Sequence, residues 1–97
     1  MTLKTKRWDP VAQLDTPERI ALYLEAAFED GDPTLIAAAI GDAAKAYGMT
    51  RLAKKTGLAR EALYRALSDD GNPELATVLK VLRALGLRLS PVEDEAA

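Results

Sequence analysis

The charged residues between positions 43 and 67 are the side chains of this chain best suited to a chemical role. Six of them are basic and one, Glu61, is acidic. The segments on either side are each richer in acidic than in basic residues, and the whole chain has a net charge of −2. A local concentration of positive charge matters for contact with a polyanion, whatever the charge of the whole chain. The basic segment therefore indicates nucleic acid as a ligand, with a solvated helix surface as the simpler alternative.

The residue types that most catalytic and metal sites need are missing. The 97 residues include neither cysteine nor histidine, which excludes disulfides, thiolate ligands and the commonest general base. Ser68 and Ser90 are the only serines, and no pairing of a nucleophile with a base is evident. The adjacent acids Asp69 and Asp70 fall in a turn-rich segment. We therefore expect no catalytic site, no metal site and no cofactor.

The basic segment has the pattern of two short helices joined by a tight turn. The sequence predicts helices over 51–56 and 60–67, with Gly57 supplying the positive φ that a sharp exit from a helix requires. The inner seam of the pair would be formed by Leu52, Ala53, Leu63 and Ala66. This is the spacing of a helix-turn-helix over 49–67, whose second helix can enter the DNA major groove.

The other helices are indicated by apolar stripes at helical spacing and by capping residues before prolines. We expect full helices over 17–29, 33–47 and 73–85, and no more than one helical turn after Pro10. Thr50 is expected to cap the 51–56 helix. The four predicted helix starts are Asp9-Pro10, Thr16-Pro17, Asp32-Pro33 and Asn72-Pro73.

The chain is expected to divide into an N-terminal arm over 1–16, a helical DNA-binding domain over 17–90 and a disordered tail over 91–97. Trp8, in the arm, would either clamp onto the core or contact a partner. Residues 87–90 alternate apolar and polar, which is weak evidence for a short strand. Such a strand would need the arm or a second subunit as its partner. No signal peptide or membrane span is visible, so we expect a cytoplasmic protein.

The outward positions of the 60–67 helix are the candidates for contacting DNA bases. They are Arg60, Glu61, Tyr64 and Arg65. An arginine can donate two hydrogen bonds to guanine, and a glutamate can accept one from cytosine. Alternatively, the arginines are solvated helix charges, Glu61 pairs with Arg65 four residues later, and Tyr64 packs on the protein.

Phosphate contacts are expected around the 51–56 helix. Backbone N–H groups at a helix start suit an anion, and basic side chains follow one turn later. The predicted phosphate contacts are Thr50, Arg51, Lys54 and Lys55.

Four stretches that together span most of the chain resemble a known family. They are LDTPE at 14–18, YLEAAFEDGDPTLIAAAIGD at 23–42, GMTRLAKKTGLAREALYRALS at 48–68 and GNPELATVLKVLRALGLRL at 71–89. They resemble the HigA-like addiction module antidotes, antitoxins of the Xre helix-turn-helix superfamily. The resemblance implies an all-α, five-helix, lambda-repressor-like domain that forms a homodimer. It also implies a type II antitoxin that represses its own operator and neutralises a RelE/HigB-like ribonuclease toxin.

One position departs from the pattern of that family. Family members usually carry a serine where this chain has Ala59, and an alanine cannot cap the helix that follows. We expect the fold to survive this change, although the affinity for DNA could be lower. Two other functions stay open, namely a stand-alone Xre-family regulator without a toxin and a protein-binding adaptor whose helix-turn-helix does not bind DNA.

Overall fold

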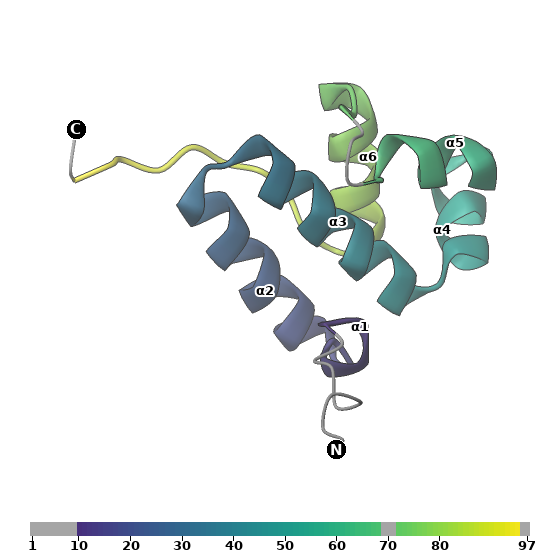
Figure 1. Cartoon of the computed structure of the whole chain (residues 1–97), viewed down its shortest axis with the longest axis horizontal. Helices are drawn as coiled ribbons and strands as arrows, with labels where there is room; N and C mark the ends of the chain where they lie inside the picture. The colour runs from purple at the N-terminus through teal and green to yellow at the C-terminus, as the bar shows by residue number, and fades with distance from the viewer. Residues whose placement is uncertain (1–9, 69–71, 96–97) are drawn as a thin grey trace, which may run out of the picture.

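The structure, a computed structural model, describes residues 10–68 and 72–95 and contains α-helices but no strand within them (Figure 1). The helices are α1 (Pro10–Gln13), α2 (Pro17–Asp30), α3 (Pro33–Tyr47), α4 (Met49–Thr56), α5 (Arg60–Ala66) and α6 (Leu75–Ala84). The predicted all-α class is therefore confirmed, and α2 to α6 correspond to the five expected full helices. Their lambda-repressor-like arrangement stays a prediction. The predictions for Trp8, for Asp69 and Asp70, and for the last two residues of the tail lie outside the described residues.

Helices α2 and α3 form a hairpin whose two starts are capped as the sequence predicts. Thr16 Oγ1 accepts a hydrogen bond from the Arg19 N–H at 3.1 Å, before α2. Asp32 Oδ1 accepts one from the Thr34 N–H at 3.1 Å, before α3. Gly31, with φ +86°, ends α2 in the left-handed conformation that glycine adopts without strain.

The core lies where α2, α3, the α4–α5 pair and α6 meet. Its fully buried large side chains are Ile40, Leu52, Leu63, Val81 and Leu82. They come from α3, α4, α5 and α6, so residues far apart in the sequence share one apolar interior. Helix α1 contacts α3, and Leu14 just after α1 is also buried. This part of the predicted N-terminal arm therefore packs on the helical domain.

Two helix starts differ from the prediction. Helix α6 begins at Leu75, because Glu74 before it has an extended backbone, so Asn72 does not cap it. Thr50 lies inside α4 instead of capping it, because Gly48 ends α3 and its carbonyl oxygen already accepts the Leu52 N–H at 2.9 Å. The two helices therefore follow one another with a single residue between them.

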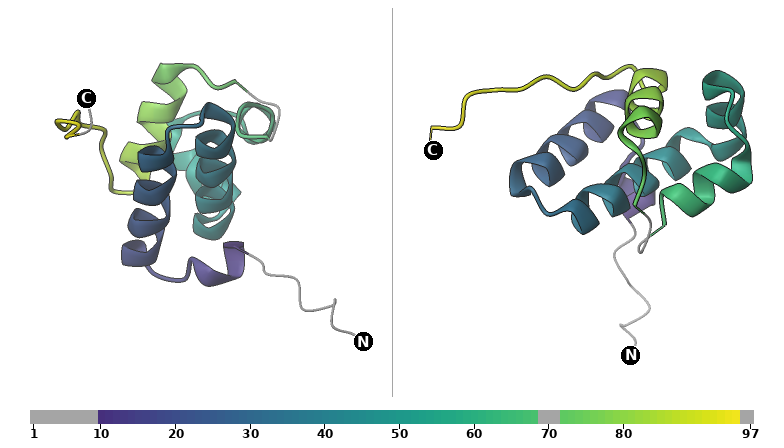
Figure 2. Two further views of the ribbon diagram at one scale, coloured as in Figure 1. Left: turned by 60° about the vertical axis from the view of Figure 1, so that its left-hand side comes forward. Right: turned by 90° about the horizontal axis from the view of Figure 1, so that it is seen from above.

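The segment after α6 leaves the helical body as an irregular chain (Figures 1 and 2). No strand forms over 87–90 within the described residues, so the predicted strand is absent from the single chain. A partner strand would be needed to satisfy its backbone groups, and pairing with a second subunit stays a prediction. No helix in the described part of the chain has both the length and the apolar character that crossing a membrane requires.

Candidate nucleic-acid interface

The predicted pair of helices is present at one end of the molecule (Figure 1), as α4 and α5. Gly57, with φ +77°, ends α4, and its N–H donates to the carbonyl oxygen of Ala53 at 2.9 Å. Leu52 and Leu63 are fully buried, and Ala53 and Ala66 are half-buried against the core. The predicted seam is thus confirmed, and it directs the opposite faces of both helices into solvent.

Thr56 holds the turn between the two helices. Its hydroxyl donates to the carbonyl oxygen of Leu52 at 2.8 Å and accepts the N–H of Leu58 at 3.2 Å. One side chain thereby joins the last turn of α4 to the segment that leads into α5. This role of Thr56 was not predicted from the sequence, although a threonine directly before a helix-ending glycine could have indicated it.

The predicted base-contacting residues of α5 all lie on its exposed face. The Arg60 guanidinium lies 5.6 Å from the centre of the Tyr64 ring, and its Nη2 donates to the Tyr64 hydroxyl at 3.4 Å. Tyr64 nevertheless keeps 44% of its surface exposed. Within the described residues, no ion pair joins Glu61 to Arg65 four residues later. The charges of this face are therefore not neutralised by one another.

The predicted phosphate-contacting residues of α4 are also exposed. They are Thr50, Arg51, Lys54 and Lys55. Arg51 stacks on the Tyr47 ring, with 4.1 Å between its guanidinium carbon and the ring centre, and donates to the Tyr47 carbonyl oxygen at 3.5 Å. This contact between α3 and α4 orients one of the three cations and thereby reduces the side-chain entropy that binding would cost.

Helices α4 and α5 both begin without a side-chain cap. Gly48 precedes α4 and Ala59 precedes α5, and neither has a side chain that could accept from the backbone N–H groups of the first turn. This agrees with the expectation that Ala59 leaves α5 uncapped. Unpaired N–H groups and the helix dipole together favour an anion at a helix start. Both features therefore add to the positive character of this end of the molecule.

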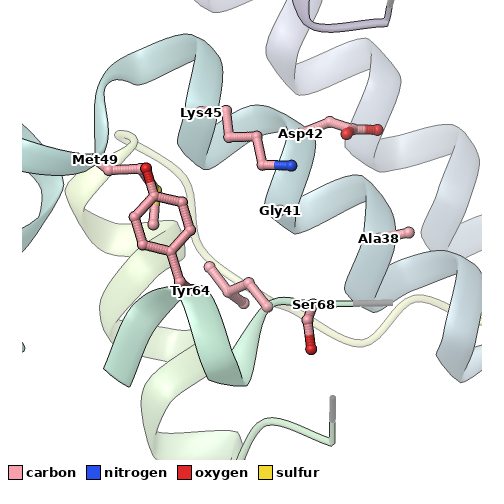
Figure 3. A pocket seen from close by; sticks show the side chains of 8 residues that line it. Ala38, Gly41, Asp42, Lys45, Met49, Tyr64 and Ser68 are labelled. Atoms are coloured by element: carbon pink, nitrogen blue, oxygen red, sulfur yellow. The ribbon is translucent and has the colours of Figure 1, made fainter. Parts of the chain in front are cut away.

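A hollow of about 270 Å³ lies between α3 and α5 (Figure 3). Lys45 from the last turn of α3 and Tyr64 from α5 reach toward it from opposite sides. The sequence analysis counted Lys45 within the basic segment but did not assign it to the interface. Its place one turn before α4 was the available signal, and the packing of α3 against α5 turns that position into a shared surface.

The α3 side of the hollow is held in place by two close contacts. The Tyr23 hydroxyl donates to Asp42 Oδ2 at 2.7 Å, which joins α2 to α3. Burial, this hydrogen bond and the negative charge of Asp42 raise the pKa of Tyr23 to about 12. Gly41 contacts the end of α5 so closely that a Cβ there would lie 2.6 Å from the Leu67 carbonyl oxygen. A side chain at position 41 would therefore push α5 away from α3.

The all-helical fold and its exposed basic helix pair are compatible with the helix-turn-helix class. Residues 4–93 match a family model described as "Probable addiction module antidote protein", and the chain belongs to this family. A protein of Haemophilus influenzae strain Rd, described as uncharacterized, is 43% identical over 88 residues, which are 91% of each chain. No solved structure matches the chain. The resemblance to addiction module antidotes is thus confirmed, and an antidote implies a toxin partner of some kind.

Proposed function

We propose that this protein is the antitoxin of a type II toxin-antitoxin module and that it binds its own operator DNA through α4 and α5. The DNA-binding part is carried by the exposure of Arg60 and Arg65 on α5, the helix whose Leu63 is buried in the core. Membership of the antidote family supports the antitoxin part. The protein acts in the cytoplasm, on the nucleoid when it is bound to DNA.

In this proposal, α5 enters the major groove and its exposed residues read base edges. Arg60 and Arg65 donate to guanines, Glu61 accepts from a cytosine, and Tyr64 supports Arg60 through the contact described above. Thr50, Arg51, Lys54 and Lys55 of α4 contact the phosphates on one side of the groove. Lys45, in the last turn of α3, is added to this set because it lines the same hollow as Tyr64.

The active form is a homodimer that meets two successive major grooves of a palindromic operator. This requires the two copies of α5 to lie about 34–36 Å apart. Binding at its own promoter represses transcription of the module. The antitoxin also neutralises a RelE/HigB-like ribonuclease by direct contact. The resemblance to HigA-like antidotes supports the repression, the dimer and the kind of toxin.

A mobility-shift assay on the DNA upstream of the protein's own gene tests this proposal. Arg60→Ala and Arg65→Ala should each weaken binding by about 1–3 kcal/mol, while helicity and melting temperature stay unchanged. Arg19→Ala is the matched control, because Arg19 is an exposed arginine on α2, far from α5 in the sequence. If both α5 variants shift the operator as the wild type does, these residues do not read DNA.

One alternative function, a protein-binding adaptor that keeps the fold without binding DNA, is favoured by Ala59, which lacks a hydroxyl that could contact a phosphate, and by the net charge of −2. For an adaptor, the wild-type chain would shift neither the upstream DNA nor a random duplex, even at low salt. A basic surface that binds DNA should instead shift both duplexes at low salt, because phosphate contacts do not depend on sequence.

A further inference from the structure

Away from α4 and α5, an apolar surface crosses the end of α2, the start of α3, the start of α6 and the chain after α6. It consists of two adjoining hollows of about 500 and 460 Å³, which share Phe28 and Leu89. Its apolar lining includes Phe28, Leu75, Leu89 and Val92. We call these two hollows the apolar groove.

The apolar groove exposes large side chains that a monomer would be expected to bury. Leu75 is 66% exposed and Val92 is 87% exposed. Single exposed leucines are common on protein surfaces, but exposed apolar residues joined by continuous hollows mark an interaction site. Removing this surface from water would favour association by about 25 cal/mol per Å² before the costs of ordering.

Acidic residues surround the apolar groove. Glu25 and Glu29 of α2 line it together with one basic residue, Arg88. Asp30 at the end of α2 and Asp32 in the following turn are exposed, and residues 93–95 are all acidic. The surplus of negative charge disfavours nucleic acid as the occupant. It also disfavours a second copy of this chain, because two such surfaces would bring like charges together. A partner with complementary charge would have a basic surface around an apolar centre.

We propose that the apolar groove is the docking surface for the toxin, bound through the toxin's basic RNA-binding side. This rests on the proposed function, which supplies a ribonuclease as the partner. A ribonuclease must present positive charge to a polyanion, and the acidic rim of the groove offers the same kind of charge as RNA. The turn after α2 and the segment after α6 lie at the opposite end of the molecule from α5 (Figures 1 and 2). The toxin is therefore bound mainly at the end of the antitoxin opposite α5, although the start of α6, which also lines the groove, lies beside α5.

The test measures binding of the full chain to the purified product of the neighbouring gene. Val92→Lys and Leu89→Lys should each weaken this binding by about tenfold or more, because both place a cation in the apolar centre facing a basic partner. Leu22→Lys is the matched control, since Leu22 is 64% exposed on α2 but lines neither hollow.

Glu29→Gln should weaken the binding severalfold and flatten its salt dependence, whereas Glu18→Gln should change neither.

Each result separates this inference from the proposed function. If the wild-type chain binds the neighbouring protein and all groove variants bind it equally well, the docking surface is elsewhere and the antitoxin function stands. Equal weakening by Leu22→Lys also overturns the assignment. If the wild-type chain does not bind that protein, the proposed toxin is wrong and the docking surface falls with it, while the operator shift is unaffected. If Val92→Lys converts a dimer into a monomer in light scattering, a second copy covers the groove and the inference is wrong.

Discussion

The α2–α3 hairpin and the α4–α5 pair share the same helix–turn–helix connection but differ in the side-chain capping of their helix starts. Each consists of two helices joined by a short link that contains a glycine in the left-handed conformation, Gly31 in the hairpin and Gly57 in the pair. In the hairpin, both helix starts are capped by side chains, Thr16 and Asp32. In the pair, neither start has a side-chain cap. Side-chain oxygens thus accept from one N–H group at each helix start of the hairpin, whereas no side chain does so in the pair.

The two regions also differ in charge. The turn of the hairpin is acidic, at Glu29, Asp30 and Asp32, and the exposed residues of α4 and α5 are mostly basic. A polyanion is thus attracted to one end of the molecule and repelled from the other. The net charge of −2 for the whole chain therefore describes neither of these two surfaces. One small domain thus carries two surfaces of opposite charge.

The largest effect is expected where the two regions touch, at Gly41 of α3. Gly41→Ala should lower the free energy of unfolding by about 1–3 kcal/mol, because its Cβ would overlap the carbonyl oxygen at the end of α5. Urea denaturation measures the change. Gly31→Ala is the contrasting variant, since a Cβ there meets nothing within 4 Å and only the positive φ is strained. A Gly41→Ala protein as stable as the wild type would show that α3 and α5 do not approach this closely.

The difference in capping can be tested in both regions at once. Asp32→Ala should destabilise the protein by about 0.5–2 kcal/mol, because the N–H of Thr34 loses its acceptor. Ala59→Ser should stabilise it by a similar amount, because a hydroxyl is added where α5 has no cap. Thermal melts of the two variants and the wild type give the comparison. If Ala59→Ser leaves stability unchanged, other groups already satisfy the start of α5.

The contribution of the basic helices α4 and α5 should be measurable in the salt dependence of DNA binding. Lys54→Ala and Lys55→Ala should each reduce the slope of log affinity against log salt by about 0.9, if each lysine contacts one phosphate. The loss should be the same for the operator and for a random duplex, because phosphate contacts carry no sequence information. Arg19→Ala, on the hairpin, should leave the slope unchanged. Equal slopes for the wild type and both lysine variants would remove α4 from the interface.

The smallest effect concerns the hydrogen bond between Tyr23 and Asp42, and it should appear only in alkali. The pKa of Tyr23, raised to about 12, lies above its ordinary value of 10.0, so folding favours the neutral phenol. This contribution to stability is complete below pH 10 and is lost as the pH rises from 10 to 12. The stability difference between the wild type and Tyr23→Phe should therefore be constant up to about pH 9 and then shrink. A difference that stays constant up to pH 12 would contradict this.

The sequence alone determined the features that depend on residues close together in the chain. It predicted α3 over its observed bounds and α2 to within one residue, because prolines, capping side chains and glycines act within a few positions of themselves. The buried seam of α4 and α5 followed from helical periodicity in the same way. The exposed face of α5, with Arg60 and Arg65, followed from that seam. Their contact with DNA stays a prediction.

Only the tertiary structure decided the features that join distant parts of the chain. It brought Lys45 to the same hollow as Tyr64, joined Tyr23 to Asp42, and placed Gly41 against the end of α5. It also showed that the segment after α6 contributes Leu89 and Val92 to a groove instead of forming a strand within the chain. Local patterns cannot specify such contacts, because they depend on how helices pack in three dimensions. The apolar groove was therefore invisible until α2, α3 and α6 were placed side by side.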